Sequence, residues 1–294
     1  MFRTDDTGRA VDLSPPRVEP PPDARTLARR RADGALGEDE ELLVRELFDR
    51  AGLDARAYRR ETLRRRLPAC LRLLRAADAA EARQRVQQQP RLAAAAVATM
   101  VIGVTSFFRD AAVFDHLTYA VLPALPRAAG HPRVWSIGCS DGDELYSVAI
   151  LLAEIGLLGG AFLLGTDCRS DAVARAREGR YGPRDVRDVP PAWLARYFVR
   201  EDEKEAWRVA DSLRRTVQWR TGDVTRLQEP GTWDLILCRN IAMYLRPEVA
   251  GRLWERLEMA LRPGGFLVLG KAERPLGCQR LANFAPCIYR RLPA

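Results

Sequence analysis

The hydrophobic pattern changes near His131 and divides the chain into a helical part and a mixed part. Beyond this point, short apolar runs alternate with longer amphipathic segments. The runs "RVWSIGC", "AFLLGTD", "TVQWRTGDV", "WDLILCRN" and "FLVLGKAE" predict strands, whereas "DELYSVAILLAEIG", "SDAVARAREGRY" and "RPEVAGRLWERLEMAL" predict helices. Because strands that alternate with helices usually form a parallel sheet covered on both faces, we expect an α/β fold here.

Apolar residues between Asp39 and Arg109 recur at helical intervals. In "DEELLVRELFDRAGL" four of them share one face, namely Leu42, Leu43, Leu47 and Phe48. The next segment, "YRRETLRRRLPACLRLLRA", carries a stripe made of Leu63, Leu67, Leu71 and Leu74. Pro68 interrupts this segment, so we expect its helix to be kinked or split there.

Arginines cover the remaining surface of that second segment. They are Arg59, Arg60, Arg64, Arg66 and Arg75. Such a face is either an ordinary solvated helix surface or a docking surface for an acidic partner. No aromatic residues alternate with these arginines, which argues against single-stranded nucleic acid as the ligand.

The first 35 residues are rich in proline and charge, so we expect a disordered tail at 1–35. A helical domain with its linker is then expected at 36–110, and a larger domain at 111–294. The N-terminus lacks the apolar segment of a signal peptide. The longest apolar run, "VAILLAEIGLLGGAFLLG", contains a glutamate and a Gly-Gly pair, so we expect a helix, a turn and a strand there instead of a membrane span.

Composition narrows the class of protein further. The net charge of +8 and the pI near 9.5 predict attraction to an acidic surface. The six cysteines are scattered without a C-x-x-C pair and there are only two histidines, so neither a metal site nor a disulfide framework is expected. A cytoplasmic location is consistent with this cysteine usage.

The stretch "SIGCSDGDELYS" joins the first predicted strand of the mixed part to a helix. In a parallel sheet such a loop binds the ligand at the carboxyl ends of the strands. The spacing around Gly138 is not G-x-G-x-x-G, and Asp141, Asp143 and Glu144 would repel a phosphate at the helix N-terminus. A cofactor with a cationic centre and no phosphate fits better, and S-adenosylmethionine is the common one.

Asp167 ends the second strand, in "LLGTD". An acidic residue about twenty residues after the glycine loop binds the ribose in this architecture. The alternative is that Asp167 caps the helix that follows.

Several separate motifs agree with one family. "TSFFRD" (Thr105 to Asp110), "GCSDGDELYS", "GTDCRSDAVARAREGRY", "CRNIAMYL" and "LRPGGFLVLGKAE" occur in that order. Together they resemble the CheR-type chemotaxis receptor methyltransferases, from about Glu40 to the end of the chain. These enzymes transfer a methyl group from S-adenosylmethionine to glutamate side chains of chemoreceptors, leaving S-adenosylhomocysteine.

The resemblance implies a class I methyltransferase (Rossmann-like) domain, a small N-terminal helical domain, and a small β-subdomain inserted near 190–220. It implies cofactor contacts for nine residues, which are Thr105, Arg109, Gly138, Glu144, Asp167, Asp223, Val224, Cys238 and Arg239. Tyr244 corresponds to the family tyrosine beside the transferred methyl group. The basic helix corresponds to the element implicated in receptor recognition, which assigns substrate binding to Arg59, Arg60, Arg64 and Arg66.

The residue types suit this chemistry. A glutamate carboxylate is ionised at neutral pH and needs no general base, which is consistent with the lack of a catalytic histidine. Arg109 could orient the carboxylate or the cofactor through its planar donors, or else form an interdomain ion pair. Tyr244 could donate a hydrogen bond at the transfer site or pack as a core aromatic. Asn240 is expected to fix its loop, and Phe107 and Phe108 to pack between the domains.

This chain departs from the family pattern at several positions. Gly103 replaces an asparagine, Asp141 a small uncharged residue and Leu145 a proline. Asp223 stands where the family has the asparagine that contacts the adenine, and a carboxylate can still accept a bond from the adenine amino group. Lys271 and Ala272 replace a histidine and a serine, while Glu273 is retained.

Three functions remain open at this stage. The first is a protein-glutamate O-methyltransferase whose partner is the cytoplasmic domain of a chemoreceptor. The second is a related methyltransferase acting on another protein or small-molecule carboxylate, and the third is a non-catalytic cofactor-binding regulator of a signalling array. Nucleic acid is not expected as a substrate, because the N-P-P-Y-type motif is absent from the sequence.

Overall fold

The computed structural model describes residues 36–293 except 102, 104, 126–130, 227, 228, 230 and 231, together with two short strands near the N-terminus. The chain forms two compact units, 1–36 and 37–294. In the first, β1 (Arg3–Thr4) pairs with β2 (Ala10–Val11) in antiparallel fashion. The rest of the predicted tail at 1–35 lies outside the described residues.

The second unit begins with four α-helices and one 3-10 turn. They are α2 (Glu38–Arg50), η1 (Ala55–Ala57), α3 (Arg60–Leu74), α4 (Ala79–Gln88) and α5 (Leu92–Met100). Acidic residues in the first turn of α2 favour its N-terminus electrostatically, and the Glu40 carboxylate accepts from the Gly37 N–H at 2.8 Å. The predicted apolar face of α2 is buried through Leu43, Leu47 and Phe48.

Pro68 does not split α3, which runs unbroken from Arg60 to Leu74. Leu63, Leu67 and Leu74 are buried, whereas Leu71 is half-buried. Proline removes one backbone donor, but the buried stripe on both sides of it keeps the helix packed against α5.

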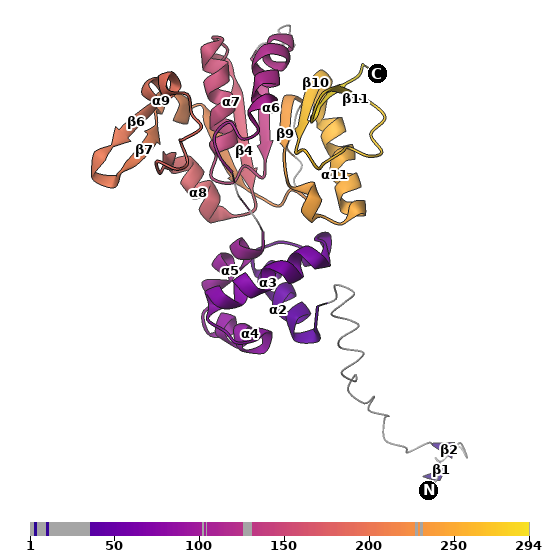
Figure 1. Cartoon of the computed structure of the whole chain (residues 1–294). Coiled ribbons are helices and arrows are strands. Elements are labelled where there is room, and N and C mark those ends of the chain that lie inside the picture. Colours follow the sequence, from indigo (N-terminus) through magenta and orange to yellow (C-terminus); the bar gives the residue numbers. More distant parts are fainter. Residues whose placement is uncertain are drawn as a thin grey trace. The chain divides into compact units, whose positions relative to one another are not determined.

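The remainder of the second unit is built on a seven-stranded sheet (Figure 1). Its strands are β3 (Arg133–Ile137), β4 (Phe162–Asp167), β8 (Val217–Thr221), β9 (Trp233–Cys238), β10 (Leu261–Leu269), β11 (Leu281–Ala285) and β12 (Ile288–Arg291). Their order is β11-β12-β10-β9-β3-β4-β8. The strands from β10 to β8 are parallel, while β12 and β11 are antiparallel. This is the predicted α/β fold.

Helices cover both faces of this sheet. They are α6 (Ala111–His116), which continues into the π-helical turn η2 (Leu117–Val121) and the 3-10 turn η3 (Leu122–Ala124), and α7 (Asp143–Glu154), α8 (Ser170–Glu178) and α11 (Pro247–Ala260). Val134 and Leu235 join α6 and α7 in one apolar cluster, while the alternate residues Trp135 and Ile236 are buried outside it. Because the sheet is buried on both faces, its strands are continuous apolar runs.

The longest apolar run forms α7, the turn η4 (Leu158–Gly160) and β4, as predicted. None of the helices in the described part of the chain is both long and apolar enough to span a bilayer.

A three-stranded antiparallel sheet is inserted between α8 and β8. Its strands are β5 (Arg180–Tyr181), β6 (Phe198–Glu201) and β7 (Ala206–Val209), and the helices α9 (Pro191–Tyr197) and α10 (Asp211–Arg214) flank it. The small sheet starts upstream of the predicted 190–220, because Gly179 ends α8 in a left-handed conformation and turns the chain directly into β5. Residues from Val217 onward belong to the large sheet.

Phe107 and Phe108 anchor the segment that follows the helices. The Phe107 ring contacts the rings of Tyr181 and Phe198 at 4.8 and 5.2 Å between centroids. Phe108 contacts Phe114 and Trp193. These phenylalanines therefore pack on the small sheet, α6 and α9 and belong to the core of the sheet region, where the sequence predicted packing between domains.

Candidate functional site

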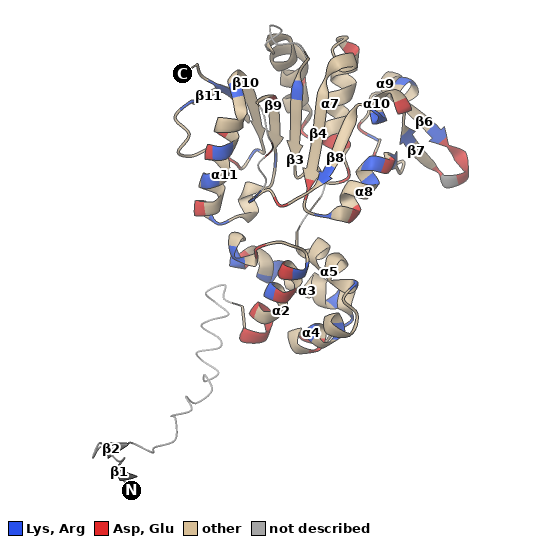
Figure 2. Ribbon diagram, turned by 180° about the vertical axis from the view of Figure 1, so that it is seen from behind, with Lys and Arg blue, Asp and Glu red and all other residues tan. Residues whose placement is uncertain are grey.

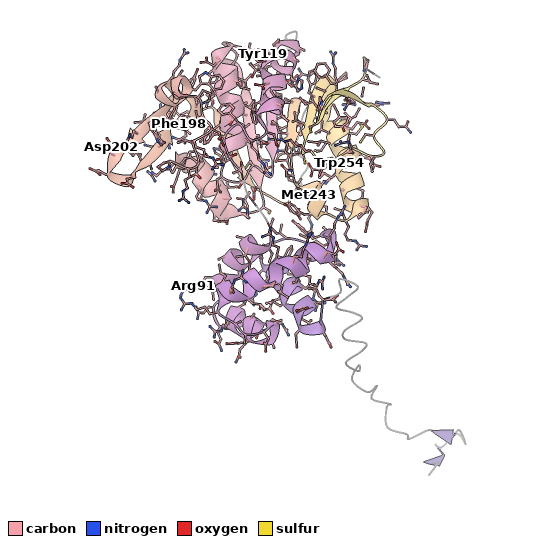
Figure 3. The ribbon with its side chains drawn as sticks, in the orientation of Figure 1. Arg91, Tyr119, Phe198, Asp202, Met243 and Trp254 are labelled. Atoms are coloured by element: carbon pink, nitrogen blue, oxygen red, sulfur yellow. The ribbon has the colours of Figure 1, made fainter. Side chains whose placement is uncertain are left out.

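One cavity lies at the carboxyl ends of the parallel strands, where the strand order reverses between β3 and β9. Ligands bind at such a switch point in open α/β sheets. The predicted site residues that line it are Thr105, Arg109, Gly138, Glu144, Asp167, Asp223, Val224, Arg239 and Tyr244. Figure 3 shows Met243, which also lines the cavity, at the opposite end of the sheet from Tyr119.

Among the nine predicted cofactor-binding residues, Cys238 does not line this cavity. It is the last residue of β9 and is fully buried, paired in register with Ile137 and Leu269 on the neighbouring strands. The cavity wall is formed by the next two residues, Arg239 and Asn240, because the chain leaves the sheet there.

The three carboxylates of the glycine loop point to different environments. Asp141 forms an ion pair with Arg175 of α8 at 2.9 Å. Asp143 is buried, and burial raises the pKa of its carboxyl to about 7. Only Glu144 of the three lines the cavity. Glu144, the one of the three that was assigned to the cofactor, is thus the one that reaches the cavity, whereas Asp141 is paired with α8 and Asp143 is buried away from it.

Glu144 belongs to a buried ionic network. Its Oε1 accepts from the Ser136 hydroxyl at 2.9 Å, and its Oε2 accepts from Nη1 of Arg239 at 3.0 Å. The same guanidinium donates through Nη2 to Asp110 at 2.6 Å and to the Arg109 carbonyl at 3.0 Å. Arg239 thus joins the glycine loop, the "TSFFRD" segment and the end of β9.

Lys271 extends this network from the loop after β10, where its ammonium pairs with Asp110. Burial alone would raise the pKa of Asp110, but the bond to Lys271 and the charge of Arg239 hold it below its ordinary value. The lysine that departs from the family pattern therefore contributes a second cation to the same carboxylate.

Asp167 holds the glycine loop against β4. Its Oδ2 accepts from the Ser140 N–H at 2.9 Å, and Oδ1 accepts from the Arg169 N–H at 2.9 Å. The residue at the N-cap of α8 is Arg169, which makes no side-chain cap bond. Asp167 therefore fixes a turn and the loop, and it does not cap the helix. Ser140, whose N–H donates to Asp167, has a left-handed backbone conformation with φ of 50°.

The Arg169 guanidinium lies in the space beside Gly103. It donates to the Ser140 hydroxyl at 2.8 Å and to Asp167 at 3.3 Å, and the Ser140 hydroxyl donates to the Gly103 carbonyl at 3.1 Å. A Cβ atom built on Gly103 would overlap this guanidinium. The side chain that the family carries at this position would therefore have no room here unless Arg169 moved.

Glu273 fixes the loop that carries Tyr244. This buried carboxylate accepts from four backbone N–H groups at 2.8–3.2 Å, those of Gly270, Asn240, Ile241 and Met243. Tyr244 ends the 3-10 turn η6 (Ala242–Tyr244) and is half-buried on the cavity wall, whereas Leu245 beside it is fully buried. Tyr244 thus lies at the cavity surface, and the residue that packs in the core at this point is Leu245.

Two buried acceptor atoms on the cavity wall accept no hydrogen bond from the described residues. They are Oδ2 of Asp223 and Oδ1 of Asn240. S-adenosylmethionine carries donors that match them, namely the adenine amino group, two ribose hydroxyls and an ammonium. The donor and acceptor pattern of the wall therefore fits this cofactor.

Sequence reasoning missed several residues of the wall. Tyr58, Cys168 and Arg169 line the cavity, and Ser106 and Ile241 do as well. Tyr58 precedes the basic helix, and nothing in the local pattern indicates that it reaches the site. Asn240 lines the cavity with φ of 60°, which agrees with its expected place at a sharp loop.

The four predicted substrate-binding arginines lie at or near the start of α3, outside the cavity. Nε of Arg59 donates to the Leu245 carbonyl at 2.8 Å, and Arg60 pairs with Glu41 at 3.0 Å. Arg64 and Arg66 are half-buried. Their assignment to substrate binding stays a prediction.

The chain is similar in sequence to known methyltransferases. A probable biofilm formation methyltransferase WspC from Pseudomonas putida is 31% identical over 254 residues, covering 81% of this chain. Chemotaxis protein methyltransferase 1 from Pseudomonas aeruginosa is 32% identical over 201 residues, covering 65% of this chain and 73% of that protein. Among solved structures, S-adenosylmethionine-bound CalS10, an amino pentose methyltransferase from Micromonospora echinaspora, is 18% identical with a TM-score of 0.34, covering 56% of this chain and 50% of that one.

This chain spans 59% of the length of the WspC protein. The family described as CheR methyltransferase, SAM binding domain, matches residues 103–287, more than half of the chain and the whole of the cavity except Tyr58 and Val101. The chain therefore belongs to the CheR methyltransferase family, and its cofactor is S-adenosylmethionine.

Proposed function

We propose that this protein is a protein-glutamate O-methyltransferase whose substrate is the cytoplasmic domain of a chemoreceptor. The observation that carries the proposal is the convergence of Arg109, Glu144, Asp167 and Tyr244 on one cavity at the switch point of the sheet. These residues come from four separate segments, so their meeting is not a consequence of local sequence. The chemotaxis methyltransferase relatives support the same substrate class.

The reaction requires alignment more than proton transfer. The bound cofactor supplies a methyl group on a positively charged sulfur. A glutamate carboxylate has a pKa near 4.3, so it is already a nucleophile at neutral pH. The protein must therefore remove water from the carboxylate and hold one oxygen in line with the methyl carbon.

Arg109 and Tyr244 are suited to that alignment. The Arg109 guanidinium can bind a carboxylate with two parallel N–H donors. The backbone of Arg109 is held by the bond from Arg239 to its carbonyl. Tyr244 can donate its hydroxyl at the cavity wall, with its loop held by Glu273. Glu144 and Asp167 would help to hold the cofactor, with Asp223 Oδ2 accepting from the adenine amino group.

A protein of a biofilm-formation system is the second candidate substrate. It is favoured by the WspC relative, which matches a larger share of this chain than the chemotaxis methyltransferase of Pseudomonas aeruginosa does, 81% against 65%. Both candidates would accept the methyl group on carboxylates, so one assay with a preparation of each separates them.

The test combines binding and transfer. Calorimetric titration with S-adenosylmethionine and S-adenosylhomocysteine measures the cofactor site. Labelled methyl transfer to membranes containing a chemoreceptor, followed by alkali treatment, then identifies the product, because carboxyl methyl esters are cleaved by alkali. Binding with alkali-labile label on the receptor is expected. Binding of the cofactor with no alkali-labile label on either candidate protein would refute the proposed substrate.

A further inference from the structure

A second cavity lies beside the cofactor cavity, and we call it the arginine groove. Three segments line it: the turn around η1, the loop after β8, and the first three turns of α11. Five arginines contribute to its walls, namely Arg56, Arg226, Arg246, Arg252 and Arg256. They face three carboxylates, those of Asp54, Glu248 and Glu255. Figure 2 shows the charged residues along α11.

Ion pairs inside the groove leave an excess of positive charge. Arg56 pairs with Asp54 at 3.0 Å and Arg246 pairs with Glu248 at 2.8 Å. Arg226 and Arg252 are exposed, and neither forms an ion pair with any residue that the structure describes. With five arginines and three carboxylates, the lining has an excess of two positive charges, and such an excess in a concave site favours an anionic ligand.

Arg256 lies one helical turn from Arg252 on the wall of the groove. It is half-buried, and its Nη2 donates to the Val224 carbonyl at 2.9 Å. Burial lowers the pKa of Arg256, the Asp223 carboxylate opposes this shift, and the neighbouring charge of Arg252 adds to it. Like charges four residues apart on a helix repel each other, so an anion bound between them would stabilise this turn.

The residues that line the arginine groove are neighbours in sequence of residues that line the cofactor cavity. Ala57, Thr225 and Arg246 line the groove, while their neighbours Tyr58, Val224 and Tyr244 line the cavity. Backbone bonds of 2.9 Å from Arg59 N to Tyr244 O and from Arg246 N to Ala57 O hold two of these segments together. The residues that line the two cavities are therefore only one or two positions apart in the sequence. Since consecutive Cα atoms are about 3.8 Å apart, the two cavities adjoin each other.

We propose that the arginine groove binds acidic side chains of the methyl-accepting protein that flank the methylated glutamate, an inference that rests on the proposed function. A helical substrate presents side chains about 5.4 Å apart on successive turns. With one glutamate at Tyr244, acidic residues one or two turns along such a helix would meet the adjoining groove. No aromatic residue lines the groove among the described residues, so it lacks the stacking surfaces that single-stranded nucleic acid uses.

Charge reversal at the two unpaired arginines tests the groove. Arg226→Glu combined with Arg252→Glu should raise the KM for a receptor cytoplasmic fragment at least tenfold, and should flatten the dependence of KM on salt between low and physiological ionic strength. The calorimetric affinity for S-adenosylhomocysteine should stay within twofold. A matched control, Arg45→Glu with Arg91→Glu, changes net charge equally at exposed positions outside both cavities and should leave KM unchanged. Equal KM values for both double variants would overturn the proposal.

A direct binding measurement separates the groove from the proposed function. A fluorescent glutamate-rich helical peptide is titrated into the wild-type protein and both double variants, and its anisotropy is measured. Weakened binding only in the groove variant supports the groove even if no receptor is methylated. Equal binding by all three proteins, or displacement of the peptide by a single-stranded oligonucleotide that binds the wild type more tightly, refutes it.

Discussion

Replacement of Gly103 by alanine should disrupt the cofactor site through Arg169. Residue 103 has no side chain, and alanine would add a single Cβ atom there. The new Cβ would overlap the Arg169 guanidinium, which has to leave its place between Ser140 and Asp167. The substitution is therefore a way to displace a buried arginine without deleting it.

The expected loss of cofactor affinity follows from the hydrogen bonds that Arg169 loses. Its side chain is 9% exposed, and it donates to Ser140 at 2.8 Å and to Asp167 at 3.3 Å. A hydrogen bond involving a charged group contributes about 1.5–3 kcal/mol, so displacement costs on the order of 3 kcal/mol in the glycine loop. Since about 1.4 kcal/mol is a tenfold change in affinity, the dissociation constant for S-adenosylhomocysteine should rise roughly 100-fold.

A double-mutant cycle tests this reasoning by calorimetry. Gly103→Ala and Arg169→Ser should each weaken binding by a similar factor, and the double variant should be no weaker than Arg169→Ser alone, because the overlap has gone. Gly251→Ala is the matched control, since its Cβ would meet no atom within 4 Å. Wild-type affinity in Gly103→Ala, or additive losses in the double variant, would falsify the role assigned to Arg169.

Three further predictions test other parts of the site. Tyr244→Phe should lower kcat about 100-fold while the affinity for S-adenosylhomocysteine is kept, since one donor at the transfer site is lost; unchanged kcat would remove its role. Glu273→Gln should lower the melting temperature by several degrees and weaken methyl transfer, because an amide cannot accept four N–H bonds as well as a carboxylate. Asp143→Asn should stabilise the protein most at high pH. The folded-state pKa of Asp143 is raised to about 7 from an ordinary value of 3.8, so the stability that its proton provides is complete below pH 3.8 and is lost as pH rises to 7. In urea unfolding at pH 8, the free energy of unfolding of Asp143→Asn should exceed that of the wild type by at most about 4 kcal/mol. Equal dependence of this free energy on pH in the two proteins would contradict the prediction.

The sequence by itself predicted the layer structure of the molecule. Strands buried on both faces must be apolar throughout, and the helices between them must have one apolar side, so the alternation after His131 is visible as a pattern. The glycine loop and Asp167 were predictable for the same reason, because each directly follows a strand and the ends of parallel strands meet at one edge.

Tertiary structure decided which charges serve the site. Asp141 and Glu144 are three residues apart, yet Arg175 takes the first and Arg239 the second. Arg239 directly follows β9 and so was predictable at this edge of the sheet, whereas Arg175 lies on α8, which the local pattern does not place beside the loop.

The same holds for the contacts that depend on packing between distant segments. Arg169 fills the space left by Gly103, 66 residues earlier, and Glu273 holds the backbone of a loop that begins 33 residues before it. The arginine groove joins η1, the loop after β8 and α11 in the same way. Local periodicity records which side of an element is buried, whereas the partner of a buried charge is set by where the fold brings another segment, and only the tertiary structure determines that.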